Sequence, residues 1–274
     1  MQFEGEETMT KQDDLLNENT RARVLERLGV SNPSRDLNGL ERLYRAWCRG
    51  VPFDNVRKRL ALREGTPEPL PGGTAEDFFA SWLAHGTGGT CWPTSNALYV
   101  LLRDCGFAAR RISACMRGTD VHNHGSIIVR LDGDDYLVDS SILCESVLPL
   151  RPAKRLELDD AVHPIVVEPV DGSFCIWWGF SMSTETLPCR LLSDPVDHRF
   201  YLERYEVSRQ MSPFNDMLYA RRNFDGRLIS YVGNTRFEKT PAGVTARELG
   251  QAELAESLVA ELGLSPAIVR ELNA

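Results

Sequence analysis

The chain has 274 residues, of which 42% are hydrophobic, and a formal net charge of −8 at neutral pH. This length is sufficient for a large buried core and predicts two or three subdomains. The acidic balance and the lack of a long basic run argue against nucleic acid as a partner. No apolar run reaches the about 18 residues that would predict a membrane span.

The start of the chain and the use of cysteine favour a reducing compartment. The acidic segment Met1–Thr8 lacks the basic and apolar regions of a signal peptide and is expected to be a disordered tail. Seven cysteines are scattered without CxxC spacing, and their odd number argues against a disulfide framework. We therefore expect a cytoplasmic protein whose cysteines remain thiols, and the sequence has no cluster with the spacing of metal ligands.

Helical periodicity dominates the first third of the chain. Two apolar patterns separated by Pro33 predict two helices, and residues 63–73, rich in glycine and proline, predict a loop. Thr74 and Asp77 have the spacing of a capping box that opens a third helix. The apolar residues of these three helices are Val24, Leu25 and Leu28, then Leu40, Leu43, Tyr44 and Trp47, then Phe78, Phe79, Trp82 and Leu83.

The segment Gly88–Trp92 opens a further predicted helix. Pro93 suits a first helical turn and Gly106 a C-terminal stop. The apolar residues between them, Leu98, Leu101, Leu102 and Cys105, follow helical spacing. Cys91 is therefore expected at a helix N-terminus, where the dipole and free N–H groups favour a thiolate.

Shorter apolar runs after Gly106 predict strands and hence a small β-barrel or sheet. They cover residues 108–116, 125–131, 136–138, 161–167, 174–178 and 199–207. Residues 215–238 can add further strands, and Thr245–Leu262 is predicted to be a helix. The predicted organisation is 1–107, helical and carrying the nucleophile, then 108–205, the β-barrel, then 206–274, a mixed α/β segment.

A hairpin brings a histidine and a carboxylate together in this prediction. Asp132-Gly133, between two apolar runs, is a strong turn signal. A two-residue loop places Ser126 opposite Asp139, so His124 shares the face of Asp139 at a diagonal of ~7–8 Å. A three-residue loop would reverse this parity. His122, on the same strand face as His124, is the competing histidine.

Each of these residues also has an ordinary structural interpretation. A lone cysteine near a helix start is most often a small buried apolar residue, and His124 and Asp139 could simply be hydrogen-bonded strand ends. The ordered set of cysteine, histidine and aspartate favours nucleophilic catalysis, because that chemistry needs all three. Phe53 and Trp92 are candidate substrate-binding residues, with core packing as the alternative for both.

Four segments in order resemble the arylamine N-acetyltransferase family. Val51–Val56 resembles its Ile-Pro-Phe-Glu-Asn-Leu signature, and Gly88–Cys91 its Gly-Gly-X-Cys nucleophile motif. Tyr136–Asp139 resembles the strand that ends in the family's triad aspartate, with His124 where the triad histidine belongs. Ser212–Phe214, followed by Asp-Gly-Arg-Leu, resembles the start of its C-terminal region. The resemblance implies an α+β fold: an N-terminal helical bundle, a central β-barrel and a C-terminal α/β lid, with the site between the first two.

The chain also departs from the family pattern. The family pairs an arginine just before the two glycines with a glutamate two residues after the cysteine, and here these positions hold Thr87 and Pro93. A single buried charge left unpaired costs several kcal/mol, so the loss of both partners together makes physical sense. The nucleophile loop must then be held differently. The family's Gly-Phe-Gly after the aspartate is replaced by Ser140–Leu143, so side chains are expected to occupy that wall.

The resemblance implies an acyltransferase with Cys91, His124 and Asp139 as its triad. It would move an acyl group, most simply acetyl, from a coenzyme A thioester to an arylamine or hydrazine, with acetyl-CoA as co-substrate and no permanently bound cofactor. One alternative is an amide synthase that takes a longer acyl chain from an acyl carrier protein. The other is a thiol hydrolase or an inactive binding protein on the same scaffold.

Overall fold

The computed structural model describes residues 15–118 and 121–273, so the predicted tail Met1–Thr8 lies outside the described residues.

Side-chain caps determine where several N-terminal helices begin. Asn17, Asp36 and Thr74 each accept a hydrogen bond from the backbone N–H three residues later, which satisfies groups that a helix start leaves unpaired. The helices are α1 Glu18–Leu28, α2 Leu37–Gly50, α3 Val56–Arg63, α4 Ala75–His85 and α5 Cys91–Asp104. The four predicted helices are confirmed, and α3 was not predicted.

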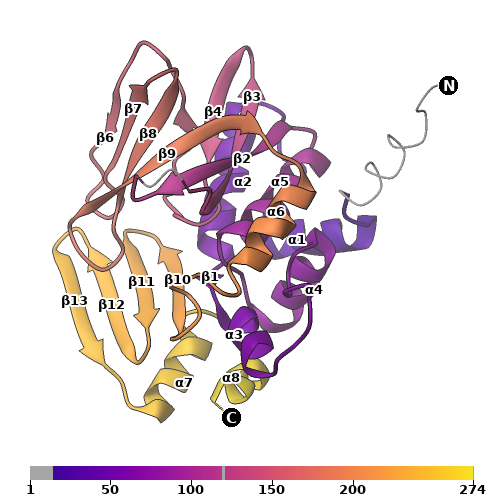
Figure 1. Ribbon diagram of the computed structural model, residues 1–274, viewed down its shortest axis with the longest axis vertical. Helices are drawn as coiled ribbons and strands as arrows, with labels where there is room; N and C mark the ends of the chain where they lie inside the picture. The colour runs from indigo at the N-terminus through magenta and orange to yellow at the C-terminus, as the bar shows by residue number, and fades with distance from the viewer. Residues whose placement is uncertain (1–14, 119–120, 274) are drawn as a thin grey trace.

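The central sheet has eight strands in the order β5-β4-β3-β2-β9-β8-β7-β6. Its strands are β2 Ala108–Met116, β3 His124–Leu131, β4 Asp134–Val138, β5 Leu148–Pro149, β6 Leu156–Leu158, β7 Ile165–Val170, β8 Ser173–Gly179 and β9 Thr186–Pro195. The expected barrel is a curled half-barrel with β5 and β6 at its edges (Figure 1). Helix α5 contacts β2 and β3 of this sheet. Sequence patterning missed β5, β6 and β9, and it began β7 too early, at residue 161.

Residues 199–207 were predicted as a strand, and this prediction was wrong, because they form α6 (His198–Val207). Asp197 caps the helix by accepting the N–H of Phe200 at 2.8 Å. Tyr201 and Tyr205, four residues apart, are both buried, as expected for one face of a helix. The alternation of aromatic and charged side chains imitated a strand, but the four-residue repeat and the cap determine the structure.

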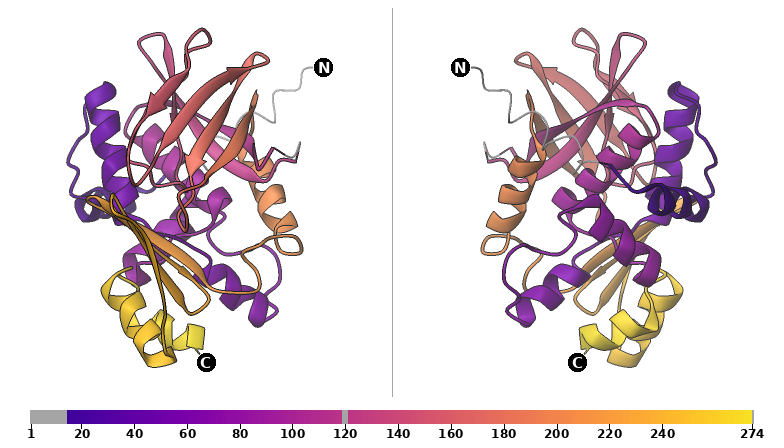
Figure 2. Two further views of the ribbon diagram at one scale, coloured as in Figure 1. Left: turned by 90° about the vertical axis from the view of Figure 1, so that its left-hand side faces the viewer. Right: turned by 90° about the vertical axis from the view of Figure 1, so that its right-hand side faces the viewer.

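A second sheet joins the two ends of the chain. Its order is β1-β10-β11-β12-β13, with β1 Phe53–Asp54, β10 Tyr219–Phe224, β11 Arg227–Val232, β12 Thr235–Thr240 and β13 Gly243–Glu248. The helix predicted from residue 245 begins later, as α7 Gln251–Ala260, because residues 243–248 pair with β12. It is followed by α8 Pro266–Asn273, and both helices lie below this sheet in Figure 2. The first and third predicted segments therefore contribute strands to one sheet. The division of the chain at residues 107 and 205 stays a prediction.

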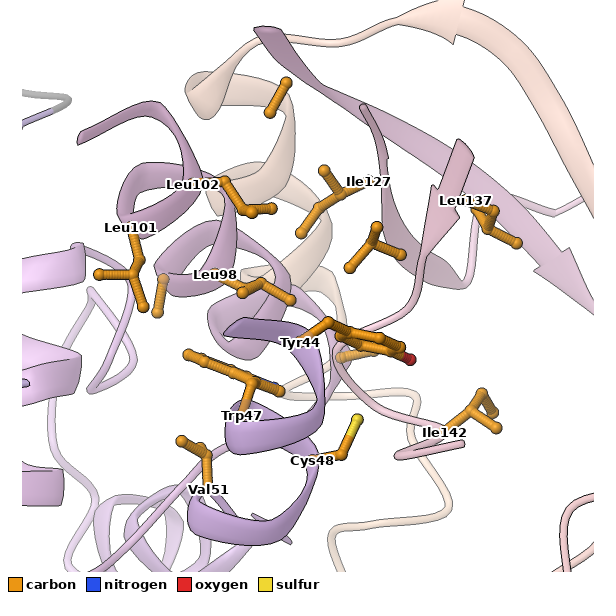
Figure 3. Close-up of a cluster of buried hydrophobic side chains, with 14 of the residues drawn as sticks. Tyr44, Trp47, Cys48, Val51, Leu98, Leu101, Leu102, Ile127, Leu137 and Ile142 are labelled. Atoms are coloured by element: carbon orange, nitrogen blue, oxygen red, sulfur yellow. The ribbon is translucent and has the colours of Figure 1, made fainter. Parts of the chain in front are cut away.

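Two hydrophobic clusters hold these layers together. The larger spans the N-terminal helices, the half-barrel and α6, and the smaller joins α3, the second sheet, α7 and α8. Figure 3 shows part of the larger cluster, where Tyr44 and Trp47 of α2 approach Leu98 of α5 and Ile142, which follows β4. In the described part of the chain, no helix combines the length and apolar character needed to cross a membrane.

Candidate active site

His124 and Asp139 form a buried hydrogen-bonded pair. The imidazole Nε2 lies 2.6 Å from Asp139 Oδ2, and the two residues are 4% and 2% exposed. Burial alone would raise the pKa of Asp139, but the imidazole and backbone donors outweigh it and hold that pKa below its ordinary value. The pair therefore behaves as an ionised carboxylate next to a ring that it orients.

The β3–β4 hairpin brings this pair together, as its sequence predicts. Leu131 is paired with Asp134, so the turn at Asp132-Gly133 has two residues. Both turn residues have positive φ, 49° and 91°, which is the requirement of the tight turn that Asp-Gly favours. The register places Ser126 beside Asp139, and the Ser126 hydroxyl donates to Asp139 Oδ2 at 2.9 Å.

Helix α2 holds the backbone that carries Asp139. The Tyr44 hydroxyl donates to the Asp139 carbonyl oxygen at 2.7 Å, and Trp47 Nε1 donates to the Ser140 carbonyl oxygen at 3.2 Å. Asp139 Oδ1 also accepts the N–H groups of Ser141 and Ile142, at 2.9 and 3.0 Å. The segment Ser140–Ile142, which replaces the family's glycines, is thus held in a buried hydrogen-bond network. Sequence analysis placed Tyr44 and Trp47 in the core without this role.

Cys91 lies at the first residue of α5, beside the imidazole. It is 8% exposed, and its thiol donates to the Asn123 carbonyl oxygen at 3.8 Å. Burial acts to lower the pKa of His124, but Asp139 and a hydrogen bond and charge from Cys91 raise it to about 10. The preceding residue, Thr90, makes no side-chain cap to the helix, so the first N–H groups of α5 are left without that acceptor.

The competing histidine, His122, is not part of this arrangement. It is exposed, its Nδ1 lies 2.8 Å from the hydroxyl of Ser113, and its ring packs edge-on against Phe200. The described structure therefore gives the contacts with Asp139 and Cys91 to His124.

The loop before Cys91 is held by Asp54. Asp54 Oδ2 accepts the N–H of Gly88 at 2.6 Å, and its Oδ1 accepts the N–H of Val56 at 3.0 Å. Its own N–H donates to the Gly89 carbonyl oxygen at 3.1 Å. At Gly88, an added Cβ would lie 1.7 Å from the Pro52 carbonyl oxygen, so only glycine fits. Asp54 thus supplies the alternative support that the missing charge pair requires.

The two positions that depart from the family pattern are neutral and buried. The Thr87 hydroxyl lies 2.7 Å from that of Ser81, and Pro93 packs within 3.5 Å of the point where a Cβ on Gly72 or Gly89 would lie. No charge is left unpaired at either position.

Lys58 is a buried cation near this site. It is 2% exposed and donates to the Ser208 carbonyl oxygen and hydroxyl. Burial lowers the pKa of Lys58 to about 8, while the charge of Cys91 acts in the opposite direction.

Both aromatic candidates are buried, with different surroundings. Trp92 is 4% exposed and packs on Tyr201 and Phe200 of α6, with ring centroids 5.0 and 6.3 Å away. Its neighbours are those of a core residue. Phe53 is 3% exposed, and its ring contacts two half-buried rings, Phe214 at 5.4 Å and Tyr219 at 5.7 Å.

Clusters of potential metal ligands were looked for in the described part of the chain. Among residues 15–118 and 121–273, no group of three or more histidine, cysteine, aspartate or glutamate side chains could hold a metal ion. The groups that lie together at this site are the Cys91 thiol, the His124 imidazole, the Asp139 carboxylate and the N–H groups at the start of α5.

Sequence comparison gives two related findings. A family model described as N-acetyltransferase matches residues 36–157, the segment that contains Cys91, His124 and Asp139. An arylamine N-acetyltransferase from Mycolicibacterium smegmatis is 26% identical over 186 residues, which are 68% of this chain and 54% of that relative. The match thus spans about half the length of the relative.

Solved structures share the fold over nearly the whole chain. Mycobacterium smegmatis arylamine N-acetyltransferase has a TM-score of 0.77 at 18% identity and covers 91% of this chain and 96% of its own. The Mycobacterium marinum enzyme in complex with CoA has a TM-score of 0.78 at 16% identity, over 92% and 96% of the two chains. The Salmonella typhimurium enzyme has a TM-score of 0.76 at 15% identity, over 92% and 97%. The chain is thus similar to an arylamine N-acetyltransferase over part of its sequence, and it shares the fold of solved arylamine N-acetyltransferases.

Proposed function

We propose that the protein transfers an acetyl group from acetyl-CoA to an arylamine or hydrazine through a thioester on Cys91. The observation that carries this proposal is the buried imidazole of His124, bonded to Asp139 on one side and next to the Cys91 thiol on the other. The acetyl group and the arylamine are those in the names of the relatives, one of which was solved with CoA, and the hydrazine follows from the sequence resemblance.

The first half-reaction starts from a thiolate at Cys91 and an imidazolium at His124. The sulfur attacks the thioester carbonyl carbon, the bond to the coenzyme A sulfur breaks, and His124 gives its proton to the departing thiolate. Asp139 stabilises the positive ring and fixes its orientation. The uncapped N–H groups at the start of α5 are in position to donate to the developing oxyanion.

The second half-reaction returns the enzyme to its starting state. The amine nitrogen attacks the acetyl carbonyl carbon on Cys91, and neutral His124 takes one proton from that nitrogen. The carbon–sulfur bond then breaks, which leaves an amide, a thiolate and an imidazolium. Both proton transfers use the same ring, and Nδ1 is the nitrogen for them because Asp139 occupies Nε2.

Intact-protein mass spectrometry tests the proposal. Incubation with acetyl-CoA and no acceptor should add one acetyl group, which peptide mapping should place on Cys91. The half-buried thiols Cys105 and Cys175 serve as internal controls, because burial raises the pKa of each and neither has an imidazole partner in the described structure. Cys91→Ala should abolish labelling and Cys105→Ala should not. Labelling that persists in Cys91→Ala contradicts the proposal.

A panel of donors and acceptors separates the alternatives. Replacement of the family's glycines by Ser140–Ile142, all buried, favours a second candidate: an amide synthase that takes a longer acyl chain from a carrier protein. Labelling by a carrier-bound acyl group but not by acetyl-CoA would favour that candidate. Release of free acid without an amine would indicate a hydrolase, and a Cys91 that iodoacetamide does not modify would indicate an inactive scaffold.

A further inference from the structure

The second sheet has two buried faces of opposite character. Ala220, Ile229 and Tyr231 point to one face and belong to the hydrophobic cluster with α7 and α8. The alternate residues of the same strands point to the other face, because side chains alternate along a strand. Four of those residues are polar and buried, Arg221 at 8% exposure, Asn223 at 2%, Ser230 at 0% and Lys239 at 2%, and apolar Leu228 lies between Asn223 and Lys239.

Two donors on this polar face have no partner within the described part of the chain. Arg221 and Ser230 are directly opposite in the β10–β11 register, so their side chains leave the sheet side by side. Neither Arg221 Nε nor Ser230 Oγ has a hydrogen-bond partner among the described residues. A buried polar group without a partner is costly, so two adjacent ones indicate a place for an acceptor.

Two cations on this face make no ion pair in the described part of the chain, and two carboxylates lie at its border: Glu145 Oε1 accepts from Asn223 Nδ2 at 2.5 Å, and the charge of Asp160 acts on Lys239. Among the described residues, Arg221 makes no ion pair: its Nη2 donates to the Ser141 carbonyl oxygen, and its guanidinium lies over the rings of Phe53 and Tyr219, at 4.8 and 6.0 Å. Lys239 donates to the Phe180 carbonyl oxygen at 2.9 Å and likewise has no carboxylate within ion-pair distance in that part of the chain. The acceptor that fits two cations and a hydroxyl is an anion.

Arg221 lies beside the proposed catalytic residues on two sides. Ser141, whose carbonyl oxygen it contacts, donates its N–H to Asp139. Phe53, whose ring it covers, forms a β-bridge with Gly89 in the loop that carries Cys91. The polar face therefore borders the site and is not a separate buried cluster.

We propose that Arg221, with Ser230, binds a carboxylate carried by a substrate, either on the acyl group of the thioester or on the amine acceptor. A guanidinium presents parallel N–H donors that match the two oxygens of a carboxylate. The rings of Phe53, Phe214 and Tyr219 lie next to it and suit the apolar body of such a substrate. The inference deepens the proposed function by naming a charged group that the substrate must carry.

A binding experiment tests Arg221 without relying on acyl transfer. Calorimetry compares benzoate with benzamide, which has the same ring but no charge. The wild type should bind benzoate about ten- to a hundredfold more tightly, the range expected for hydrogen bonds to a charged group. Arg221→Met should remove this preference and Ser230→Ala should reduce it. Arg222→Met is the matched control, since Arg222 lies on the opposite face and donates to the Arg49 carbonyl oxygen; it should keep the preference.

Steady-state kinetics then identifies which substrate carries the carboxylate. One arm compares succinyl-CoA with butyryl-CoA using aniline as acceptor, and the other compares 4-aminobenzoate with 4-aminobenzamide using acetyl-CoA. Relative to the neutral member, Arg221→Met should lower kcat/KM for the charged member of one pair by about ten- to a hundredfold.

Two results would overturn the inference. One is a wild type that binds benzoate and benzamide equally, and the other is an Arg221→Met protein that keeps the wild-type preference. If Arg221→Met does not fold, as judged by its melting transition, Arg221→Lys keeps the charge but loses the paired donors, and it should retain only part of the preference; full retention contradicts the role. Loss of acylation at Cys91 with intact benzoate selectivity would refute the proposed function alone.

Discussion

Two buried aspartates flank Cys91 and differ in their side-chain partners. Asp54 and Asp139 are 1% and 2% exposed, and each accepts two backbone N–H groups. Burial raises the pKa of Asp54 to about 6, and its N–H donors and Arg57 offset this only in part. Asp139 also contacts an imidazole, and its pKa lies below the ordinary value.

This difference in pKa indicates that Asp54 has a structural role and that Asp139 has a role in the proposed reaction. Backbone donors alone do not compensate for the removal of a carboxylate from water, whereas a positive partner does. Asp54 holds a loop, and part of its charge is lost in mildly acidic solution. Asp139 stays ionised there, so it can stabilise a positive ring throughout a reaction cycle.

Replacement of the two aspartates by asparagine should separate these roles most strongly. Asp139→Asn removes the charge that steadies His124, and we expect acylation of Cys91 by acetyl-CoA to slow by about 10³- to 10⁴-fold, as for other triads. Asp54→Asn keeps an acceptor for one N–H and should slow it by no more than about tenfold. Stopped-flow or quenched mass spectrometry measures both rates. Equal losses in the two variants would contradict the distinction.

Gly88→Ala perturbs the Asp54 region without changing a charge. The new Cβ would meet the Pro52 carbonyl oxygen at 1.7 Å, so the loop must move away from Asp54. We expect a loss of about 3 kcal/mol or more in the free energy of unfolding, measured by urea denaturation. Gly250→Ala is the control, since nothing lies within 4 Å of its Cβ position and its φ is −68°. A mild effect at Gly88 would show that the loop is not held as described.

The pH dependence of stability should have opposite signs for the two aspartates. Because the folded pKa of Asp54 is above the unfolded value of ~4, its unfavourable contribution is absent below about pH 4 and complete above about pH 6. Asp139 is favourable above about pH 4, and its contribution is lost as the pH falls below that. His124, raised to about 10, contributes below about pH 6.5 and loses this contribution towards pH 10.

Asp54→Asn provides the measurement that isolates one of these contributions. Between pH 4 and 6, the stability of the variant relative to the wild type should rise by up to about 2–3 kcal/mol, as measured by urea denaturation at a series of pH values. A relative stability that does not change over this range would mean that Asp54 is not destabilised by burial.

The smallest effect is expected at Thr87, which occupies one of the two positions where the family has a charged pair. Thr87→Val removes its hydrogen bond to Ser81 with little change of shape, and about 1 kcal/mol of stability should be lost. The rate of Cys91 acylation should be unchanged, because the Asp54 contacts remain. A large loss of rate would assign Thr87 part of the support that the comparison gives to Asp54.

Local signals predicted the site better than they predicted the sheet that borders it. The Asp-Gly turn fixes the hairpin parity, so the contact of His124 with Asp139 could be derived from sequence alone. The support from Asp54 could not be derived, because it depends on a contact with Gly88 between elements of different layers. Arg221 was likewise hidden, since a charged residue in a strand usually predicts a solvent-facing position.

The bonds from Tyr44 and Trp47 of α2 end on main-chain oxygens at residues 139 and 140. Main-chain oxygens are present whatever the side chain, so a substitution at residue 139 or 140 that keeps the backbone in place also keeps the acceptors for both bonds. A protein expressed as two polypeptides, cut between residues 107 and 108, would have its cysteine on one fragment and its histidine and aspartate on the other. Activity would then return only on reassembly, which makes this scaffold a natural design for a two-fragment complementation sensor.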